Sequence, residues 1–316
     1  MSHLYPSRPT ALPARFRRQR LLIVGCGDVG VRVARLLHQR MTIVAVSSSA
    51  ASRALALRAA GVRHVLEGNL DVPTSIARLS GLATRLLHLA PPPTDTDASD
   101  PRTRSLLASL RQRSLPAVVV YGSTSGVYGD CGGALIDETH ALNPATPRAR
   151  RRVDAERQVR AWGQGTGTSV AVLRIPGIYA ADREGGTPAD RLRRGVPVLR
   201  PEDDVYTSHV HADDLARACV LALWRSRPGR TYHVCDDTRL LMGDYFDRAA
   251  DLLGLPRPPR VDREQAQKVL SPMMYSFMTE SRRLDNTRMK VELGLHLQHP
   301  TVDDGLALSV LRSRPA

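Results

Sequence analysis

The sequence predicts an α/β protein: a doubly wound parallel sheet with a smaller, irregular C-terminal region. Short apolar runs alternate with amphipathic stretches from residue 21 to about 175. A glycine-rich turn joins the first run to the first helix, and beyond residue 175 proline and glycine become frequent while the alternation weakens. We therefore expect a basic, loosely attached arm over 1–20, a sheet domain over 21–175, and an irregular region over 176–316, of which about 207–225 packs back on the sheet domain.

Each element follows from its hydrophobic pattern. The run Leu21–Val24 is apolar throughout, as in a strand buried on both faces. Val29, Val33, Leu36 and Leu37 then recur at helical spacing. The same criteria predict strands over 42–46, 64–66, 86–90 and 117–121, and helices over 51–60 and 102–113.

Two further elements are predicted from local signals. Thr146 followed by Pro147 is a typical helix start, because threonine caps the first turn and proline suits its first position. His209 and His211 form an H-x-H pair, which on a strand would point both rings to one side. We expect that strand to lead into a helix that packs back on the sheet.

Composition limits the function classes. Hydrophobic residues make up 42% and charged residues 24% of the 316 residues, as in globular proteins, and no apolar run is long enough to cross a bilayer. The arm carries five arginines but no apolar segment, so we expect no secretory signal peptide and a cytoplasmic protein. Aromatic residues are only 4%, which argues against an aromatic surface for single-stranded nucleic acid.

The net charge of +14 has two readings. Only Lys268 and Lys290 are lysines, and arginines are spread over the whole length, which favours a GC-rich coding bias. The alternative is a surface for an anionic partner, above all a small phosphorylated ligand. We expect a small-molecule substrate, anionic in character, and neither a membrane nor nucleic acid as a partner.

Cysteine and histidine spacing points to no metal. The four cysteines include no C-x-x-C pair, and a chain of this length needs no disulfide, so we expect reduced, mostly buried thiols. The H-x-H pair lacks a cysteine nearby and a third ligand in sequence.

The turn Gly25–Gly30 reads G-x-G-x-x-G between a predicted strand and a predicted helix. In a dinucleotide-binding turn Gly25 permits the tight bend, Gly27 lets the backbone approach a pyrophosphate, and Gly30 lets the helix pack on the strand. The free N–H groups of the helix start then face the phosphates. This context makes residues 21–175 an NAD(P)-binding Rossmann domain; the alternative is a glycine turn that binds nothing.

The end of the second strand bears on which cofactor is bound. An acidic residue there would hold the ribose hydroxyls of NAD, but the chain has Ser47–Ser49 followed by Arg53. Hydroxyls plus an arginine suit a 2′-phosphate, so we favour NADP over NAD. These serines could instead cap the following helix, and the two roles are compatible.

A series of motifs resembles the extended short-chain dehydrogenase/reductases, the NAD(P)-dependent epimerases and dehydratases of sugar nucleotides. After the glycine turn, the chain carries G-N-L, H-L-A, S-T-S-G-V-Y-G, L-R-I-P-G-I-Y and H-V-H-A-D-D-L-A in the family's order, starting at residues 68, 88, 123, 173 and 209. The likeness covers nearly the whole chain after the arm. It implies the family's fold and cofactor, and it makes a homodimer conceivable because relatives often dimerise.

The resemblance assigns roles to particular positions. Thr124 stands at the catalytic Ser or Thr position, four residues before the tyrosine of V-Y-G. Arg191, Arg193 and Arg194 stand where relatives contact substrate phosphates. The implied cofactor contacts are, for the pyrophosphate, Gly25, Gly27, Asp28, Val29 and Gly30; for the adenine, Asn69 and Leu70; and towards the nicotinamide, Leu89, Ala90, Pro91, Pro176 and Ile178.

One departure from the family is large. Its proton relay is Y-x-x-x-K, but here Arg148 stands at the tyrosine position and Arg152 at the lysine position. Arginine stays protonated near pH 7, so Arg148 cannot exchange a proton with a substrate hydroxyl. Arg152 could still contact the cofactor ribose, and Arg148 could bind a carboxylate or phosphate. Alternatively, both belong to a solvated basic face paired internally through Glu156.

The chain is therefore expected to be an atypical member of the family. Its predicted function is that of an NAD(P)-binding oxidoreductase or epimerase-like enzyme, acting on a small, phosphorylated or nucleotide-linked substrate. The alternatives are a non-catalytic NAD(P)-binding sensor or regulatory protein and, less favoured, nucleic-acid binding. Tyr128, Tyr179 and Tyr206 are candidate substitutes for the missing tyrosine by neighbourhood only.

Overall fold

The computed structural model describes residues 19–313, with side chains up to residue 307. Seven parallel strands form one sheet, which confirms the predicted doubly wound α/β class. Their spatial order is β12 (Thr231–His233), β7 (Ser169–Ile175), β5 (Val118–Thr124), β4 (Arg85–His88), β1 (Arg20–Val24), β2 (Thr42–Ser47) and β3 (His64–Glu67). The predicted arm lies outside the described residues except for Gln19 and Arg20, and Arg20 already begins β1.

Two strand ends differ from the prediction by more than one residue. β4 ends at His88 and does not reach Ala90, because the backbone N–H groups of Leu89 and Ala90 turn to the carbonyl oxygen of Val24, at 2.8 and 3.1 Å. β5 runs three residues past its predicted end and places Thr124 at its last position. Both shifts bring polar or turn residues to the carboxyl edge of the sheet.

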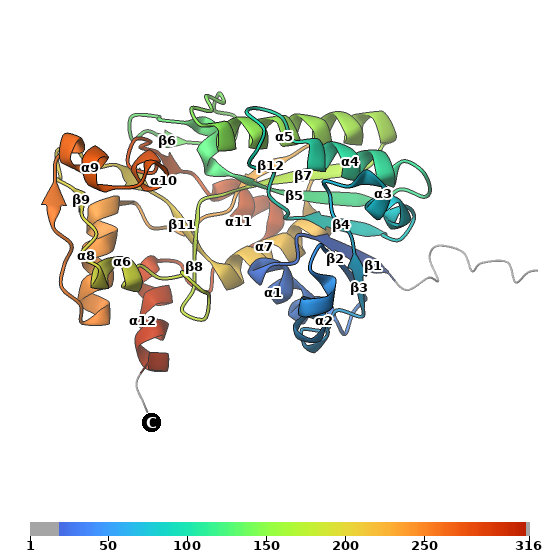
Figure 1. Cartoon of the computed structure of the whole chain (residues 1–316), viewed down its shortest axis with the longest axis horizontal. Coiled ribbons are helices and arrows are strands. Elements are labelled where there is room, and N and C mark those ends of the chain that lie inside the picture. The colour runs from blue at the N-terminus through green and yellow to red at the C-terminus, as the bar shows by residue number, and fades with distance from the viewer. Residues whose placement is uncertain (1–18, 314–316) are drawn as a thin grey trace, which may run out of the picture.

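Helices cover both faces of the sheet (Figure 1). One face carries α1 (Asp28–Leu37), α2 (Ala50–Ala59), α7 (Ala212–Arg225) and α11 (Thr287–Leu293). The other carries α3 (Pro73–Ile76), α4 (Pro101–Leu110) and α5 (Pro147–Thr166). Ile23 packs on the first face and Leu22 on the second, as the period of two in a strand requires.

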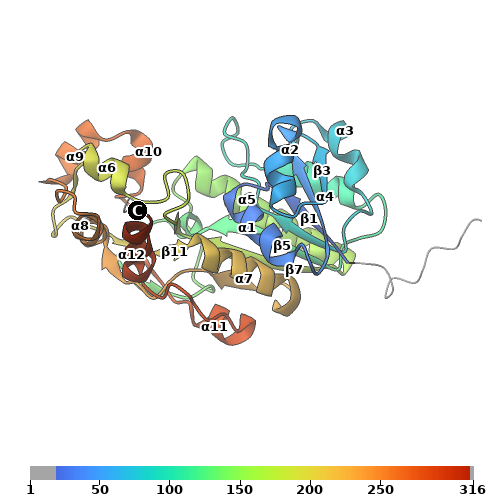
Figure 2. The same ribbon diagram turned by 90° about the horizontal axis from the view of Figure 1, so that it is seen from below.

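The remaining elements form a second region beside the carboxyl edge of the sheet (Figures 1 and 2). It has its own core, which includes Leu199, Phe246 and Leu306. No described helix is both long and apolar enough to cross a membrane. Its helices are α6 (Ala189–Arg193), α8 (Met242–Leu253), α9 (Arg263–Val269), α10 (Pro272–Ser276) and α12 (Val302–Ser313). Its short strands are β8 (Gly177–Tyr179), β9 (Val198–Leu199), β10 (Tyr206–Thr207), β13 (Leu240–Leu241) and β14 (Arg260–Val261).

Several segments return from that region to the sheet domain. The strand expected at the H-x-H pair is β11 (His209–His211), and both rings meet the ring of Tyr179. It leads into α7, which packs on α1, β4 and β5. β12 and α11 return as well, and β15 (Arg283–Leu284) pairs with β6 (Leu135–Ile136). All four cysteines are free; Cys26, Cys219 and Cys235 are buried and Cys131 is half-buried.

The strand order reverses between β1 and β4. In such sheets the connections leave the carboxyl ends of these two strands in opposite directions and open a crevice between them. Here the turn after Val24 and the loop after His88 flank that crevice. The candidate site residues are placed around it.

Candidate functional site

Sterics within the protein explain Gly25 and Gly30 of the turn after β1, but not Gly27. Gly25 has φ +84°, and a Cβ there would lie 2.3 Å from the backbone nitrogen of Ala90. A Cβ on Gly30 would lie 3.2 Å from Cys26 Sγ and from Ile23 Cγ2, so the helix packs closely on the strand. A Cβ on Gly27 would meet no atom within 4 Å. Gly27 therefore faces open space at the start of α1, next to the free N–H groups of Asp28 and Val29.

Charged side chains surround this turn. Asp28 accepts from Arg32 at 3.2 Å, and Arg32 also pairs with Asp182 at 2.6 Å and with Asp213 at 2.5 Å. The guanidinium of Arg183 lies 3.8 Å from Asp28. This network ties the start of α1 to the loop after β8 and to α7.

Arg53 and Ser47 lie at the edge of the same turn. Arg53, on α2, donates from Nη2 to the carbonyl oxygen of Cys26 at 2.8 Å. Ser47 Oγ accepts from the backbone N–H of Ser49 at 3.1 Å. Ser49 is the N-cap residue of α2, but its side chain makes no capping hydrogen bond. The alternative that these serines cap the helix through their hydroxyls is therefore not what the structure shows.

A shallow cleft of about 690 Å³ lies beyond the end of β3. Asn69 lines it, and Leu70 beside it is 8% exposed. Glu67 and Arg78 add one charge of each sign to this cleft, and Glu67 stands opposite Ser47 in the strand register. The position expected for the adenine is thus a real depression in the surface.

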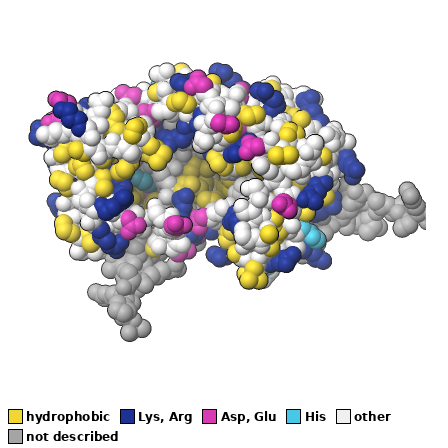
Figure 3. All heavy atoms as spheres, viewed as in Figure 1, with side chains coloured by type: hydrophobic (Ala, Val, Ile, Leu, Met, Phe, Trp, Pro, Cys, Tyr) yellow, Lys and Arg dark blue, Asp and Glu magenta, His cyan; other side chains and the backbone are white. Residues whose placement is uncertain are grey.

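A second cleft, the interdomain cleft, separates the sheet domain from the C-terminal region; its volume is also about 690 Å³. Figure 3 shows this face of the molecule hollowed, with apolar side chains on the floor of the hollow and basic ones at its edge. The sequence-predicted residues that meet there are Pro91, Thr124, Arg148, Arg152, Pro176, Ile178 and Arg191. Leu89 and Ala90 lie on the adjoining loop after β4, Ala90 against Gly25.

Thr124 and Arg152 lie at the carboxyl end of β5. Thr124 Oγ1 accepts from the backbone N–H of Gly126 at 3.3 Å, which leaves its own hydroxyl hydrogen free to donate into the cleft. Arg152 donates from Nη1 to the Tyr121 hydroxyl at 3.0 Å and to the Gly122 carbonyl at 2.8 Å. A cation therefore stands where the family has its lysine, held against the strand that carries Thr124.

Arg148 is held differently. Its guanidinium lies over the ring of Phe277, 4.6 Å from the centroid. Within the part of the chain that the structure describes, it makes no hydrogen bond or ion pair. Burial, together with neighbouring arginines, lowers the pKa of Arg148, but a guanidinium remains charged at neutral pH. Arg148 is thus a free cation at the position of the family's proton donor.

The alternative of an internally paired α5 face is wrong. Glu156 is 2% exposed and pairs with Arg174 at 2.8 Å, on β7, not with an arginine of its own helix. It also accepts from Ser123 Oγ at 2.6 Å. Arg160 turns instead to the carbonyl of Gly229 at 2.6 Å. The charge of Glu156 is therefore balanced inside the protein by Arg174.

The candidate tyrosines are now separated by their surroundings. Tyr128 is buried and absent from the cleft lining; its hydroxyl accepts from Arg174 at 2.6 Å and lies 2.5 Å from His233 Nε2. Burial raises the pKa of Tyr128 to about 12. Tyr179 and Tyr206 do line the cleft, and the Tyr179 hydroxyl donates to the Thr301 carbonyl at 3.1 Å. The hydroxyls of Tyr128 and Tyr179 are therefore already engaged by partners inside the protein.

The C-terminal half contributes residues that sequence reasoning missed. Tyr245 and Phe246 come from α8, and Phe277, Glu280 and Arg282 come from the segment after α10. The chain has only three phenylalanines, and two of them line this one cleft. The scarcity of phenylalanine was the one signal in the sequence that could have pointed to these residues.

Arg191 was singled out in the sequence, and its environment is unusual. Its Nε and Nη2 atoms are buried and make no hydrogen bond with any described residue. Its guanidinium lies over the ring of Phe246, 4.3 Å from the centroid, and burial lowers the pKa of Arg191. Buried guanidinium donors without an acceptor are costly, which makes Arg191 a candidate anion-binding residue.

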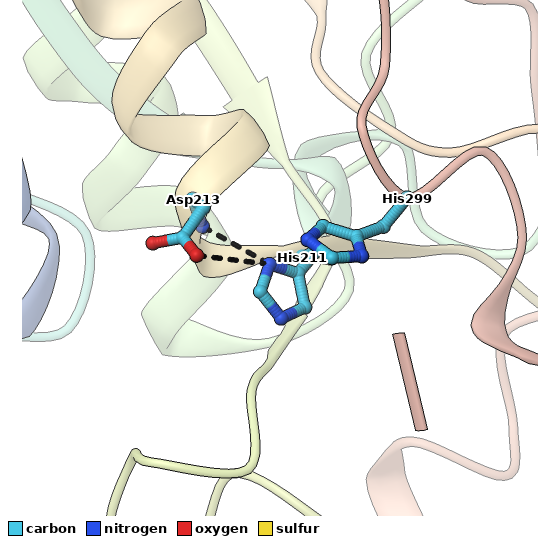
Figure 4. Close-up of side chains that lie close together, drawn as sticks. All are labelled: His211, Asp213 and His299. Atoms are coloured by element: carbon cyan, nitrogen blue, oxygen red, sulfur yellow. Dashed lines mark hydrogen bonds and ion pairs between the residues drawn. The ribbon is translucent and has the colours of Figure 1, made fainter. Parts of the chain in front are cut away.

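Three potential metal ligands do come together outside the cleft. Figure 4 shows His211 and Asp213, at the start of α7, beside His299, and their ligand atoms lie within 4.8 Å of one another. The sequence hid His299 because it lies 88 positions after His211. However, His211 Nδ1 accepts from the backbone N–H of Asp213 at 3.3 Å, and the Asp213 carboxylate already pairs with Arg32. We read the group as a polar link between α7 and the C-terminal segment.

Comparisons with known proteins agree with this geometry. The chain is 33% identical to a conserved protein of unknown function from Silicibacter pomeroyi DSS, covering 93% of this chain and 98% of that one, with a TM-score of 0.76. A structure of UDP-glucose 4-epimerase with UDP-glucose from Thermotoga maritima has a TM-score of 0.75 at 18% identity, covering 93% of this chain and 98% of that one. The latter likeness is one of fold.

A curated relative matches over a shorter stretch. It is named "Putative UDP-glucose 4-epimerase", from Methanocaldococcus jannaschii, and is 23% identical over 141 residues, which are 42% of this chain. The match spans 46% of that relative's length. The model of the NAD dependent epimerase/dehydratase family matches residues 21–235, more than half of this chain. The chain therefore belongs to the NAD-dependent epimerase/dehydratase family.

Proposed function

We propose that the protein is an NAD(P)-dependent oxidoreductase or epimerase-like enzyme of the cytoplasm, acting on a small anionic substrate that is phosphorylated or nucleotide-linked. The observation that carries this proposal is the interdomain cleft. It brings Thr124, at the expected catalytic position, and the expected cofactor contacts Arg152 and Pro176 together with the unpaired guanidinium of Arg191. The separate hydrophobic core around Leu199, Phe246 and Leu306 supports a division into a cofactor domain over 21–175 and a mainly substrate-binding region over 176–316.

The residues present fit a dinucleotide. Gly27 leaves a cradle that a Cβ would fill, directly before the free N–H groups of α1. Gly25, Asp28, Val29 and Gly30 would complete the pyrophosphate contacts. The other proposed contacts are Ser47 and Arg53 at the ribose, Asn69 and Leu70 at the adenine, and Leu89, Ala90, Pro91, Arg152, Pro176 and Ile178 towards the nicotinamide. The cofactor would supply hydride chemistry when bound.

Thr124 and Arg148 would divide the work at the reacting end. The free Thr124 hydroxyl can donate a hydrogen bond to a substrate oxygen. Arg148 can bind and orient an anion, but it cannot act as the proton donor. General acid–base catalysis contributes roughly 10²–10⁴-fold, so oxidation of an ordinary alcohol should be slow in this site.

Arg191 would anchor the other end of the substrate. A phosphate group there would satisfy its buried Nε and Nη2 donors in a two-pronged contact. The Thermotoga maritima relative holds UDP-glucose, a phosphate-containing ligand of the same class. A nucleotide-linked substrate is therefore the form we favour.

We propose NADP as the preferred cofactor. Arg53 lies against the turn after β1, where it donates to the carbonyl oxygen of Cys26, in the region of Ser47. Glu67 adds a negative charge to the neighbouring cleft. Fluorescence titrations with NADPH and NADH test this. The wild type should bind NADPH about tenfold more tightly, and Arg53→Gln should bring the ratio close to 1, because a charge-assisted hydrogen bond is lost. Arg58→Gln, on an exposed part of the same helix, is the matched control.

Equal binding of both cofactors by the wild type, or a preference that survives Arg53→Gln, would contradict the choice of NADP.

A homodimer remains an expectation from the resemblance. Light scattering at a mass of one or two chains distinguishes the two states.

A further inference from the structure

Six arginines line the interdomain cleft, and among the described lining residues Glu280 is the single acid. Four of these arginines are engaged by the protein. Arg151 donates to the Thr96 carbonyl, Arg152 to that of Gly122, Arg183 to that of Ile178, and Arg282 to Glu280 and to the Gly129 carbonyl. The guanidinium groups of these four arginines are therefore partly used to hold the walls of the cleft together.

The other two arginines make no hydrogen bond or ion pair with a described residue, and each packs on a phenylalanine, but Arg148 is exposed whereas Nε and Nη2 of Arg191 are buried. Arg148 lies 4.6 Å from the ring centroid of Phe277, and Arg191 lies 4.3 Å from that of Phe246. Neither guanidinium has a hydrogen-bonded partner at Nε or Nη2 among the residues described. A ring packed on one face fixes the guanidinium plane and leaves its N–H edge available to a ligand.

Arg148 also stands at an unfavourable place for a cation. It lies in the first turn of α5, and that turn contains no acidic residue. Arg150, Arg151 and Arg152 follow it along the helix. The N-terminus of a helix carries a partial positive charge and repels cations. Glu280, the nearby acid, already pairs with Arg282 at 2.8 Å. An anion bound at Arg148 would relieve this repulsion.

We propose that Arg148 binds a carboxylate of the substrate beside Thr124, so that the substrate carries two separate anionic groups. One is the phosphate portion at Arg191, as in the proposed function on which this inference rests. The other is a carboxylate on the portion that enters the reacting corner. The planar guanidinium edge offers two parallel N–H donors, which match the two oxygens of a carboxylate. Arg148 is then a specificity-determining residue, which explains an arginine where the family has a tyrosine.

Two matched probes test the proposal. UDP-glucose and UDP-glucuronate differ only in that a carboxylate replaces the C6 hydroxymethyl group. Calorimetric titration of the protein saturated with NADP⁺ should give at least about tenfold tighter binding of UDP-glucuronate, as expected for a charge-assisted hydrogen-bonded contact. Arg148→Met should reduce that preference to less than about threefold. Arg148→Lys, which keeps the charge but loses the paired geometry, should retain part of it.

Arg191→Met is the matched control, because it removes the other free guanidinium beside the other phenylalanine. It should weaken both probes by the same factor and leave the preference intact. Circular dichroism confirms that each variant is folded. The proposal is overturned if the wild type does not prefer UDP-glucuronate, if the preference survives Arg148→Met, or if neither probe binds. Failure of NADPH to bind would instead overturn the proposed function, so the two failures are distinguishable.

Discussion

Glu156 and Arg174 form an ion pair almost completely withdrawn from water, with side-chain exposures of 2% and 5%. The pair also forms hydrogen bonds with Ser123 and Tyr128, so it stabilises the carboxyl end of β5 from inside the protein. Glu156→Gln should lower the free energy of unfolding by roughly 3–5 kcal/mol, because it leaves a buried guanidinium without its counter-charge. Urea denaturation measures this loss. The double variant Glu156→Leu, Arg174→Met should recover much of the stability, and an unchanged midpoint in Glu156→Gln would show that the pair contributes nothing.

Single residues also show where sequence reasoning stops. Its position four residues before the tyrosine of V-Y-G was enough to single out Thr124, and helix spacing was enough to place Arg148 and Arg152 on one face. The partners of Arg148 could not be read in this way, because Phe277 lies 129 positions further along the chain. The alternative of a solvated helix face placed Glu156 on the surface, but the tertiary fold brings Arg174 to it.

At the scale of elements, the turn between β1 and α1 gives a test in which two similar substitutions differ. Gly25→Ala places a side chain at φ +84° and against the Ala90 backbone, which should cost about 2 kcal/mol or more. Gly27→Ala adds a methyl group in open space at φ −76° and should leave the stability almost unchanged. Thermal unfolding of the two variants without cofactor checks this. Equal melting temperatures would mean that the β1 and β4 loops do not touch as described.

The elements of the sheet domain were largely predictable, and the reason is physical. β1 and β2 are continuous apolar runs, and Thr146 caps α5 by accepting from Ala149 N–H at 3.2 Å, as its sequence predicts. β12 was not predicted, because three residues, Thr231–His233, carry too little pattern to be told from a loop. The C-terminal region was predicted only as irregular, since its two-residue strands depend on tertiary contacts.

At the scale of the whole molecule, buried histidines make stability depend on pH. Burial lowers the pKa of His88 to about 3 and those of His209, His211 and His233 to about 4. The unfolded chain binds these protons near pH 6.5 and the folded chain does not, so their contribution to stability is present above pH 6.5 and is lost as the pH falls towards 4. Within that window, each histidine lowers the free energy of unfolding by about 1.4 kcal/mol for every unit by which the pH falls.

Asp236 opposes this trend. Burial raises its pKa to about 8, so the folded protein keeps its proton and gains stability from it as the pH falls from 8 to 4. Burial also raises the pKa values of Asp100, Glu138 and Asp204, which act in the same direction as Asp236. Each of the four histidines takes up a proton on unfolding throughout this window, so the melting temperature should drop between pH 6.5 and 4.5. His88→Gln should make that drop shallower, whereas His38→Gln, at an exposed site, should not. A melting temperature that stays constant over this range would contradict the burial of these rings.

The central claim is that the turn after β1 holds a dinucleotide whose reactive end reaches the cleft with Thr124 and Arg148. The most direct measurement is NADPH binding by the wild type and by Gly27→Asp. The empty space at Gly27 lets the variant fold with an unchanged melting temperature, but its carboxylate would occupy the phosphate cradle and repel the ligand. We predict micromolar binding by the wild type and a loss of at least about 100-fold in the variant, which corresponds to roughly 3 kcal/mol. Wild-type protein that binds neither NADPH nor NADH, or a folded variant that binds NADPH as tightly as the wild type, would contradict the account.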